Sequence, residues 1–231
     1  DLRMSRGLGD VYKRQDITSL LYELESTKAG LQMKVKVKNK TYALKTEMMM
    51  DYNALNIVGA LTVLEAMGMF DINEYNTCIQ KIKIPGRSEV YQRKGRMIVI
   101  DSHLPKVLES LQKLKDKKEI NQIKVVIGSM GYGYQNWEPR FKTTDFIASR
   151  KKARKYAMEL LKEKVDDVYL TESDNGKEKV LDICLELKGY LEDKVSSKII
   201  EDREQAIREA IVDSKAVSYT HLRAHETCAD L

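Results

Sequence analysis

Residues 97–127 read MIVIDSHLPKVLESLQKLKDKKEINQIKVVI, and the order of residue types in this stretch decides the fold. A β-branched apolar run at 97–100 comes first, an amphipathic segment near 104–117 follows, and a second apolar run lies at 123–127. Short β-branched runs indicate buried strands, and apolar residues at helical spacing indicate a helix that covers them. We therefore predict a strand, a helix and a second strand.

The same alternation continues along the chain. Further apolar runs lie at 168–171 and 198–200, with amphipathic segments near 145–164, 178–192 and 203–213. Such alternation requires crossover connections, so we predict an α/β fold: a Rossmann-like, mostly parallel sheet with flanking helices. Ligands of these sheets bind beyond the carboxyl ends of the strands. Loops are often polar for solubility alone, so polar residues there need not form a site. Polar residues follow each expected strand: Asp101, Ser102 and His103, then 128–133, 172–177, and Asp202 with Arg203.

A different pattern precedes this region. Residues 33–45 alternate apolar and charged side chains around an Asn39-Lys40 turn, which predicts a β-hairpin with one solvated side. A helix is expected from Asp51, its cap, to Gly68, with an apolar stripe of Leu55, Val58, Leu61, Leu64 and Met67. A short second helix is expected at 71–80. Residues 83–87, KIPGR, suit a domain linker. We therefore predict that residues 16–84 are the end of one domain and that residues 85–216 form an α/β domain.

The two ends have another origin in this interpretation. Residues 5–15, SRGLGDVYKRQ, can be encoded by a DNA segment whose opposite strand, read in another frame, encodes residues 217–226, VSYTHLRAHE. An inverted repeat translated on both strands is what a sequencing adapter leaves. We therefore assign 1–15 and 217–231 to adapter artefact and expect neither tail to pack on the fold.

Composition excludes several classes of function. The net charge is +5 with both signs interspersed, so nucleic acid is not the expected partner. Between the tails only His103, Cys78 and Cys184 remain as soft ligands, too few for a zinc site or a disulfide framework. No apolar run approaches the roughly 20 residues of a membrane span. A cytoplasmic protein with no metal site in this stretch is expected.

Several short motifs carry a family resemblance. They are DYNALNIVGA at 51–60, PGRSE at 85–89, VIDSHLP at 99–105, VVIG at 125–128, LTESDN at 170–175, and Asp202-Arg203-x-x-Ala206-Ile207. In this order and spacing they resemble the C-terminal part of the Mur ligase family, closest to the UDP-N-acetylmuramoyl-tripeptide synthetase class. The resemblance implies that 16–84 is the end of the central ATP-binding domain and that 85–216 is the C-terminal domain.

The resemblance also implies an activity. ATP phosphorylates a carboxylate of a UDP-linked muramoyl-peptide-like acceptor, and the amine of an amino acid attacks the acyl phosphate. Such chemistry needs a phosphate-binding loop with a lysine and a Mg²⁺-binding hydroxyl. This chain has no Gly-Lys-Thr or Gly-Lys-Ser. The loop, and Mg²⁺ with it, is expected in an upstream part, so this stretch alone should be inactive and its catalytic residues are unknown.

Five residues are implied as nucleotide contacts. Asn53 and Asn56 would approach the adenine, Arg87 the phosphates and Asp101 the ribose hydroxyls, while His103 matches the family's Asp-Tyr-Ala-His-x-Pro segment. From the residues alone, helix capping at Asn53, a solvated Arg87 and a structural His103 are the alternatives.

The implied amino-acid pocket departs from the family. Asp174, Asn175, Gly176 and Lys177 stand where the family has Asp-Asn-Pro-Arg, so a point charge replaces a bidentate guanidinium. The interval from Asp101 to His103 is one residue shorter, and 128–140 lacks the family's Gly-Gly-Asp-Arg-Asp run, although Pro139 keeps a place. A divergent paralogue with another amino acid, or without ligase activity, fits these changes.

Two alternatives to a ligase therefore stay open. One is a non-catalytic Mur-ligase-like binder of a nucleotide or partner. The other is a basic α/β nucleic-acid-binding module, for which the lysine-rich stretches 113–118 and 150–155 and the aromatic Tyr132, Tyr134 and Trp137 are the candidates. Those lysines suit solvated helix faces equally.

Overall fold

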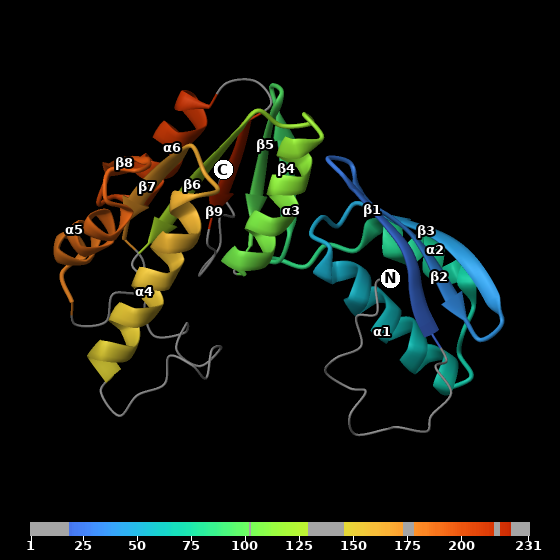
Figure 1. The fold of residues 1–231 in the computed structure, drawn as a ribbon. Coiled ribbons are helices and arrows are strands. Elements are labelled where there is room, and N and C mark those ends of the chain that lie inside the picture. The colour runs from blue at the N-terminus through green and yellow to red at the C-terminus, as the bar shows by residue number, and fades with distance from the viewer. Residues whose placement is uncertain (1–18, 102, 129–145, 173–177, 215–217, 223–231) are drawn as a thin grey trace. The chain divides into compact units, whose positions relative to one another are not determined.

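The computed structural model describes residues 19–101, 103–128, 146–172, 178–214 and 218–222 (Figure 1). The chain divides into two compact units, Asp1–Lys83 and Ile84–Leu231. Each unit is described by itself.

The first unit contains a three-stranded antiparallel sheet with the order β1-β2-β3. Its strands are β1 (Ser19–Thr27), β2 (Gly30–Val37) and β3 (Lys40–Thr46). The expected hairpin is present, with its turn at Lys38 and Asn39, one residue earlier than the sequence indicated. Its first strand pairs with β1, which the sequence analysis did not identify.

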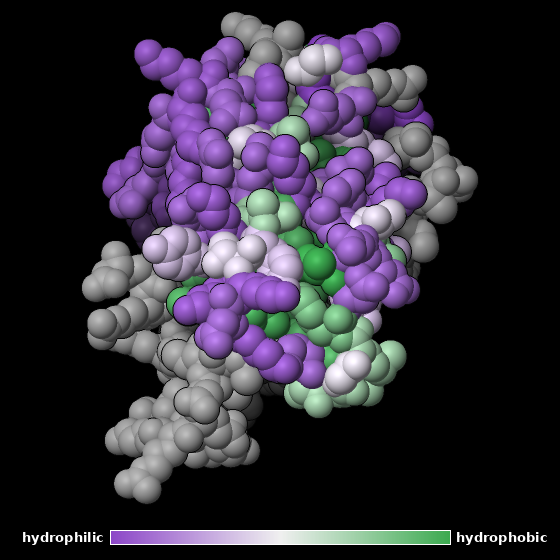
Figure 2. Space-filling model, turned by 90° about the vertical axis from the view of Figure 1, so that its right-hand side faces the viewer, coloured by the Kyte–Doolittle hydropathy of each residue, from purple (hydrophilic) through white to green (hydrophobic). Residues whose placement is uncertain are grey.

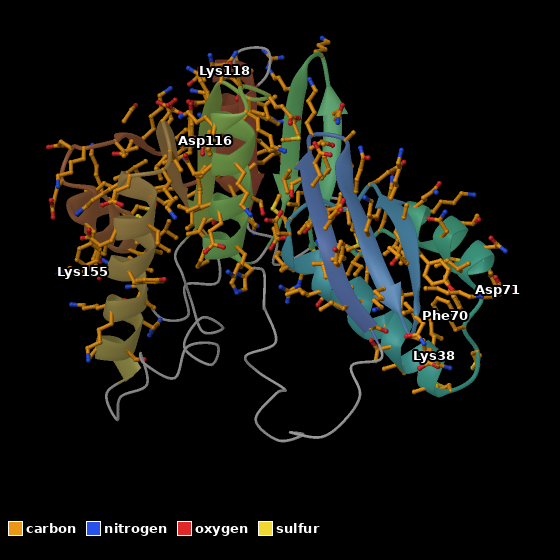
Figure 3. The ribbon with its side chains drawn as sticks, turned by 45° about the vertical axis from the view of Figure 1, so that its right-hand side comes forward. Lys38, Phe70, Asp71, Asp116, Lys118 and Lys155 are labelled. Atoms are coloured by element: carbon orange, nitrogen blue, oxygen red, sulfur yellow. The ribbon has the colours of Figure 1, made fainter. Side chains whose placement is uncertain are left out.

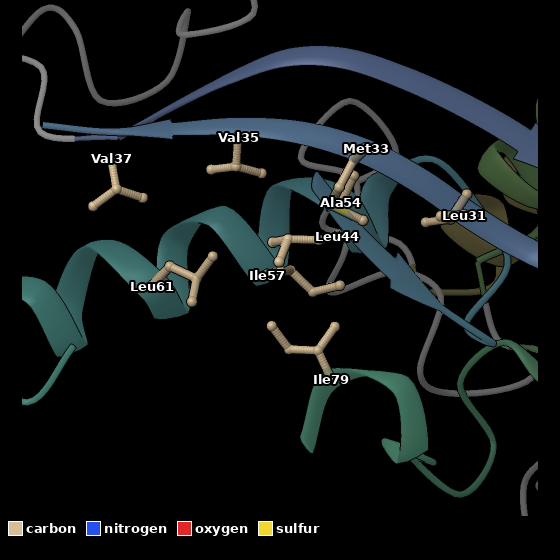
Figure 4. Packing of buried hydrophobic residues seen from close by; sticks show 9 residues of the cluster. All are labelled: Leu31, Met33, Val35, Val37, Leu44, Ala54, Ile57, Leu61 and Ile79. Carbon is tan, nitrogen blue, oxygen red and sulfur yellow. The ribbon is translucent and has the colours of Figure 1, made fainter. Parts of the chain in front are cut away.

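Two helices, α1 (Tyr52–Ala66) and α2 (Ile72–Lys81), provide the rest of this unit. Alternate residues of β2 point to one side of the sheet and pack against the helices, as Figure 4 shows. Asp71 begins α2 by accepting hydrogen bonds from the main-chain N–H groups of Asn73 and Glu74. The buried cluster is Leu31, Met33, Val35, Val37, Leu44, Ala54, Ile57, Leu61 and Ile79.

The buried side of α1 differs from the predicted stripe. Ala54, Ile57 and Leu61 are buried, whereas Leu55 and Met67 are 38% and 63% exposed. Apolar residues occur all round this helix, so its periodicity could not select the face, and contact with the sheet selects it instead. The predicted cap was also wrong, because the Asp51 carboxylate makes no capping bond and accepts a hydrogen bond from the Ser26 hydroxyl.

The second unit is the predicted α/β domain. Its six-stranded sheet has the order β4-β5-β9-β6-β7-β8, and all neighbours are parallel except β4 and β5. Its strands are β4 (Glu89–Arg93), β5 (Arg96–Ile100), β6 (Gln122–Gly128), β7 (Asp167–Thr171), β8 (Ser196–Ile199) and β9 (Ser218–Leu222). Its helices are α3 (Leu104–Asp116), α4 (Phe146–Lys162), α5 (Val180–Leu191) and α6 (Arg203–Asp213).

Helices cover both faces of this sheet, which confirms the mostly parallel, Rossmann-like arrangement (Figure 1). On one face, Ala206, Ile207 and Ala210 of α6 pack against Val126 and Tyr169. The opposite face lies under α3, α4 and α5, whose inward residues, such as Leu108, Ala157 and Leu187, are fully buried. The continuous burial of β6 and β7 follows from this double cover.

Strand β9 corrects one expectation. Residues 218–222 belong to the tail that was expected to take no part in the fold, yet they form a strand paired with both β5 and β6. Ladder hydrogen bonds join main-chain atoms, so an extended segment can fill such a position without side chains selected for it. The adapter origin of the tail stays a prediction.

The described surface is mostly hydrophilic. Figure 2 shows polar side chains over most of one face, with hydrophobic side chains in a smaller area. Lys118, after α3, and Lys155, on α4, extend outward (Figure 3). Asp116 lies beside the first of these, so both charge signs are present. Among the described helices none is long and apolar enough to cross a membrane.

Candidate functional site

A hydrogen-bonded junction forms at the carboxyl end of β5. The Asp101 carboxylate is fully buried, and its Oδ2 accepts hydrogen bonds from the main-chain N–H and the hydroxyl of Ser88, at 2.9 and 3.0 Å. Its Oδ1 accepts from the main-chain N–H of His103 at 2.7 Å. Asp101 thus ties the residue before β4 to the residue that begins α3.

The PGRSE segment enters this junction through a tight turn. The main-chain N–H of Arg87 donates to the carbonyl of Ile84 at 3.0 Å, which closes a turn with Pro85 and Gly86 at its centre. Gly86 has φ of +69°, the conformation that glycine adopts at the third position of a type II turn. Because Glu89 pairs with Ile100, the turn is held beside the carboxyl end of β5.

Three of the five predicted nucleotide contacts therefore lie in one place. Arg87 and His103 are partly exposed, and Asp101 is buried between the segments that carry them. The expected contact between Asp101 and ribose hydroxyls would require this junction to open. As described, Asp101 fixes the backbone of its neighbours, a role that the sequence motif alone did not reveal.

Asn53 and Asn56 belong to the first unit. Asn53 is buried, and its amide nitrogen donates to the carbonyl of Met49 at 2.6 Å. Asn56 is exposed and donates to the side-chain oxygen of Asn53 at 3.4 Å. Asn53 thus anchors the start of α1 and orients Asn56, which is the more accessible amide.

The carboxyl ends of β7 and β8 are joined by hydrogen bonds. Both the Thr171 hydroxyl and the main-chain N–H of Glu172 donate to the carbonyl of Glu201, at 3.1 and 3.2 Å. Asp202 then caps α6 through a hydrogen bond from the main-chain N–H of Gln205. The predicted pocket residues follow β7 in the sequence and lie outside the described residues: Asp174, Asn175 and Lys177.

The charged groups beside this edge were missed by the sequence analysis. Within the stretch predicted as a solvated helix face, Lys151 and Lys155 are exposed, but Arg154 is fully buried. Its guanidinium forms a two-bonded pair with Glu178, Nη1 to Oε1 at 3.0 Å and Nη2 to Oε2 at 2.9 Å, and Nη1 also donates to Glu186 at 3.1 Å. The sequence signal that could have indicated this pair was the four-residue spacing of Arg150 and Arg154 along α4.

Electrostatics keep this pair ionised. The hydrogen bond from Arg154 lowers the pKa of Glu178, and this effect outweighs the desolvation that opposes it. Desolvation disfavours the charge of Arg154, but the bonds and charges of Glu178 and Glu186 raise its pKa above the ordinary value. The pair is therefore a permanent structural feature near neutral pH.

Other chemistry-bearing groups have structural surroundings. Burial raises the pKa of Cys184 to about 11, which makes its thiol a poor nucleophile. Within the described ranges, no three or more His, Cys, Asp or Glu residues gather as a metal site. The aromatic residues that a nucleic-acid interface would need, Tyr132, Tyr134 and Trp137, lie outside the described residues, as does Pro139.

Comparison with known sequences identifies relatives of this chain. No family model matches it. It is 26% identical over 175 residues to the UDP-N-acetylmuramyl-tripeptide synthetase of Bifidobacterium longum, a match that covers 72% of this chain and 31% of the relative. The resemblance found in the motifs is thereby confirmed, and the chain spans about a third of the length of the curated relatives it matches.

Comparison with solved structures gives the same fold. MurF ligase from Thermotoga maritima in complex with ADP matches with a TM-score of 0.60 at 19% identity, over 90% of this chain and 43% of that one. Folylpolyglutamate synthase of Mycobacterium tuberculosis complexed with ADP matches with a TM-score of 0.64 at 16% identity, over 90% and 45%. The described part thus has the fold found in Mur-type ligases.

Proposed function

We propose that this chain is the C-terminal part of an ATP-dependent amide ligase, which adds an amino acid to a UDP-muramoyl-peptide-like acceptor through an acyl phosphate. The observation that carries the proposal is the match to a tripeptide synthetase over 72% of the chain, with residues of the PGRSE and VIDSHLP motifs joined at the carboxyl end of β5. In this reading residues 16–84 close the ATP-binding domain and 85–216 form the C-terminal domain.

The reaction explains why a second domain is needed. The acceptor carboxylate takes the terminal phosphoryl group of ATP, ADP leaves, and the amine of the amino acid attacks the acyl carbon to give a tetrahedral intermediate that expels phosphate. Most of the rate gain comes from positioning and charge stabilisation. The contribution of this chain is to place the nucleotide and the amine.

On the nucleotide side, the accessible groups are proposed to contact the ligand and the buried groups to hold them in position. Arg87 supplies a fixed fan of donors for phosphate oxygens, and the His103 side chain lies on the same junction. Asp101 holds both segments in place, with ribose contact limited to an opened junction. Asn56 is the accessible amide for an adenine edge, and Asn53 orients it. Mg²⁺ is proposed, as the family resemblance implies, to bind with a phosphate-binding loop outside this chain.

On the amino-acid side, Asp174 and Asn175 are proposed to hold the amino acid so that its amine faces the acyl phosphate. Lys177 would read its side chain as a point charge instead of a bidentate guanidinium. Lower selectivity for diaminopimelate follows. A cytoplasmic location is part of this proposal.

A non-catalytic, Mur-ligase-like binder is the second candidate. It is favoured by the changes at Lys177 and in 128–140, which fall where substrate contacts are expected. Sequencing the DNA upstream of the codon for Asp16 separates the two. A Gly-Lys-Thr or Gly-Lys-Ser loop in the same frame supports the ligase, and a complete upstream frame without such a loop supports the binder.

A calorimetric titration of this chain with ATP tests the division of labour. Only rim contacts are present without the phosphate loop, so we expect binding weaker than about 100 µM, with Arg87→Ala weakening it further. The exposed Arg208, on α6 and paired with Glu204, gives a matched control, Arg208→Ala. Submicromolar binding by the chain alone would contradict the proposal.

A further inference from the structure

The outward side of α5 carries two leucines and a glycine in a line. Leu181 and Leu185 are 44% and 54% exposed, and Gly189 is exposed one turn further along. Because these residues are four apart, they lie on one side of the helix. The opposite side of α5 is buried against the second unit, where the helix packs on β7 and β8 at one end of the sheet (Figure 1). The packing of this unit therefore does not account for the exposed line.

Gly189 is not required by the surroundings that its own chain provides. Glycine destabilises the interior of a helix, because it loses more backbone freedom on folding than other residues do. The φ angle of Gly189 is not positive, so its backbone does not demand glycine. Beyond its own helix backbone, no atom of the described residues would lie within 4 Å of a Cβ added there. Glycine at such a place is typical of a surface that another backbone approaches closely.

Two opposite charges flank this line. Asp182 follows Leu181 and Lys188 precedes Gly189, and both charged residues are exposed. Each charge suits its end of the helix, since acidic groups are favourable in the first turn and basic groups in the last. Their spacing has a second property, because each lies three residues from Leu185, on opposite sides of it. The charge pattern is therefore reversed when the helix is turned end to end about Leu185.

From this pattern we infer that α5 is the contact surface for a second copy of this chain, with the two helices antiparallel and a two-fold axis at Leu185. In this dimer Leu181 lies at the level of Gly189 of the partner, where the missing side chain leaves room for it. Asp182 lies at the level of Lys188 of the partner, and the symmetry makes this pairing of opposite charges twice. A parallel pair would set like charges against each other. The inference does not depend on the proposed function.

The contact surface is small, so the association is expected to be weak. Specific, stable interfaces bury on the order of 1,000 Å² or more in total, which one helix from each copy does not supply. We therefore expect a reversible monomer–dimer equilibrium with a dissociation constant on the order of 100 µM. Exposed apolar residues also occur on α1, including Val63 and Met67. Helix α1 is the competing surface that an experiment must separate from α5.

Sedimentation equilibrium of the full chain, from about 10 µM to about 1 mM, measures the dimer. Gly189→Met should weaken association by about tenfold or more, because its side chain fills the space that receives Leu181, while the better helix propensity of methionine preserves the fold. Gly59→Met on α1 is the matched control, since Gly59 is also an exposed helix glycine with no described atom within 4 Å of an added Cβ. Association weakened by Gly59→Met and not by Gly189→Met would overturn the inference, as would a chain that stays monomeric throughout this range.

Exchanged charges test the antiparallel register. Asp182→Lys and Lys188→Asp each set like charges opposite one another in the proposed dimer, so each variant alone should associate about threefold to tenfold more weakly. A mixture of the two variants should associate as the parent chain does, because every pair between positions 182 and 188 in a mixed dimer is opposite in sign. Thermal unfolding followed by circular dichroism checks that each variant is folded. Folded single variants that associate as strongly as the parent chain would exclude this register and overturn the inference.

Discussion

Replacing Asp101 by asparagine tests the junction at the carboxyl end of β5. The carboxylate accepts from three donors, two on Oδ2 and one on Oδ1, in a fully buried position. An asparagine of the same shape has one acceptor oxygen and one donor nitrogen. Whichever way its amide turns, its nitrogen faces either the two donors of Ser88 or the N–H of His103.

The magnitude follows from these contacts. A hydrogen bond to a charged group contributes about 1.5–3 kcal/mol, and a buried donor left without an acceptor costs about 1–3 kcal/mol. At least one donor loses its partner and the others lose a charged acceptor. We therefore expect Asp101→Asn to lower the free energy of unfolding of the second unit by about 2–4 kcal/mol.

Pulse hydrogen exchange along a urea series measures this, because peptides report each unit separately. The urea concentration at the unfolding midpoint should fall for the β6 peptide, Gln122–Gly128, and should stay unchanged for the β2 peptide, Gly30–Val37. Asp202→Asn is the control, since asparagine caps helices as well as aspartate. If Asp101→Asn changes the unfolding free energy by less than about 0.5 kcal/mol, as a surface substitution does, the junction does not organise the carboxyl end of β5.

Three further outcomes are expected. The hydrogen bond from Arg154 lowers the pKa of Glu178, so the contribution of this carboxylate to stability is complete above its ordinary pKa of 4.5 and is lost as the pH falls through the lowered pKa. The difference in unfolding free energy between the chain and Glu178→Gln should therefore shrink from pH 6 to pH 3 in urea titrations, and a constant difference would contradict this. Removing residues 1–15 should leave the unfolding midpoint unchanged. Removing residues 217–231 should lower the unfolding free energy of the second unit by more than about 1 kcal/mol, because β5 and β6 each lose a neighbouring strand. Equal stability after this second deletion would show that β9 does not contribute to the folding of the unit. In a complete parent enzyme, Lys177→Arg should raise turnover with diaminopimelate relative to turnover with lysine by the equivalent of roughly 1–3 kcal/mol. If both proteins are active and this turnover ratio does not change, residue 177 does not recognise the side chain of the amino acid.

The α/β unit could be predicted because its signals are local. Each strand is a short apolar run and each helix carries a clear stripe, so the order of elements follows from the chain alone. Strand β4 was missed because GRSEVYQRK is polar, and only the Lys94-Gly95 turn, with both φ positive, marks the hairpin with β5. Strand β9 was missed because residues 217–231 were set aside as an adapter artefact, whereas Ser218–Leu222 pair with β5 and β6.

The site residues stay a prediction, but part of their arrangement can be compared with the structure. The carboxyl-edge rule placed Asp101 and His103 after β5, and the structure brings Arg87, which only the resemblance had suggested, to the same end of that strand. It could not show that Asp101 is buried, because burial depends on Ser88, 13 residues away. Arg154 read as a surface residue in a lysine-rich helix, since only the return of the chain at Glu178 and Glu186 encloses it.

We propose that this chain completes an ATP-dependent amino-acid ligase. The most direct test is an assay of the complete parent protein with ATP, Mg²⁺, a UDP-muramoyl-dipeptide and a panel of amino acids, in which ADP release and the peptide product are measured together. We expect one ADP for each amide bond formed, in a reaction that depends on the amino acid and is slowed by Arg87→Ala. A parent protein that binds ATP but forms no amide with any amino acid would contradict it.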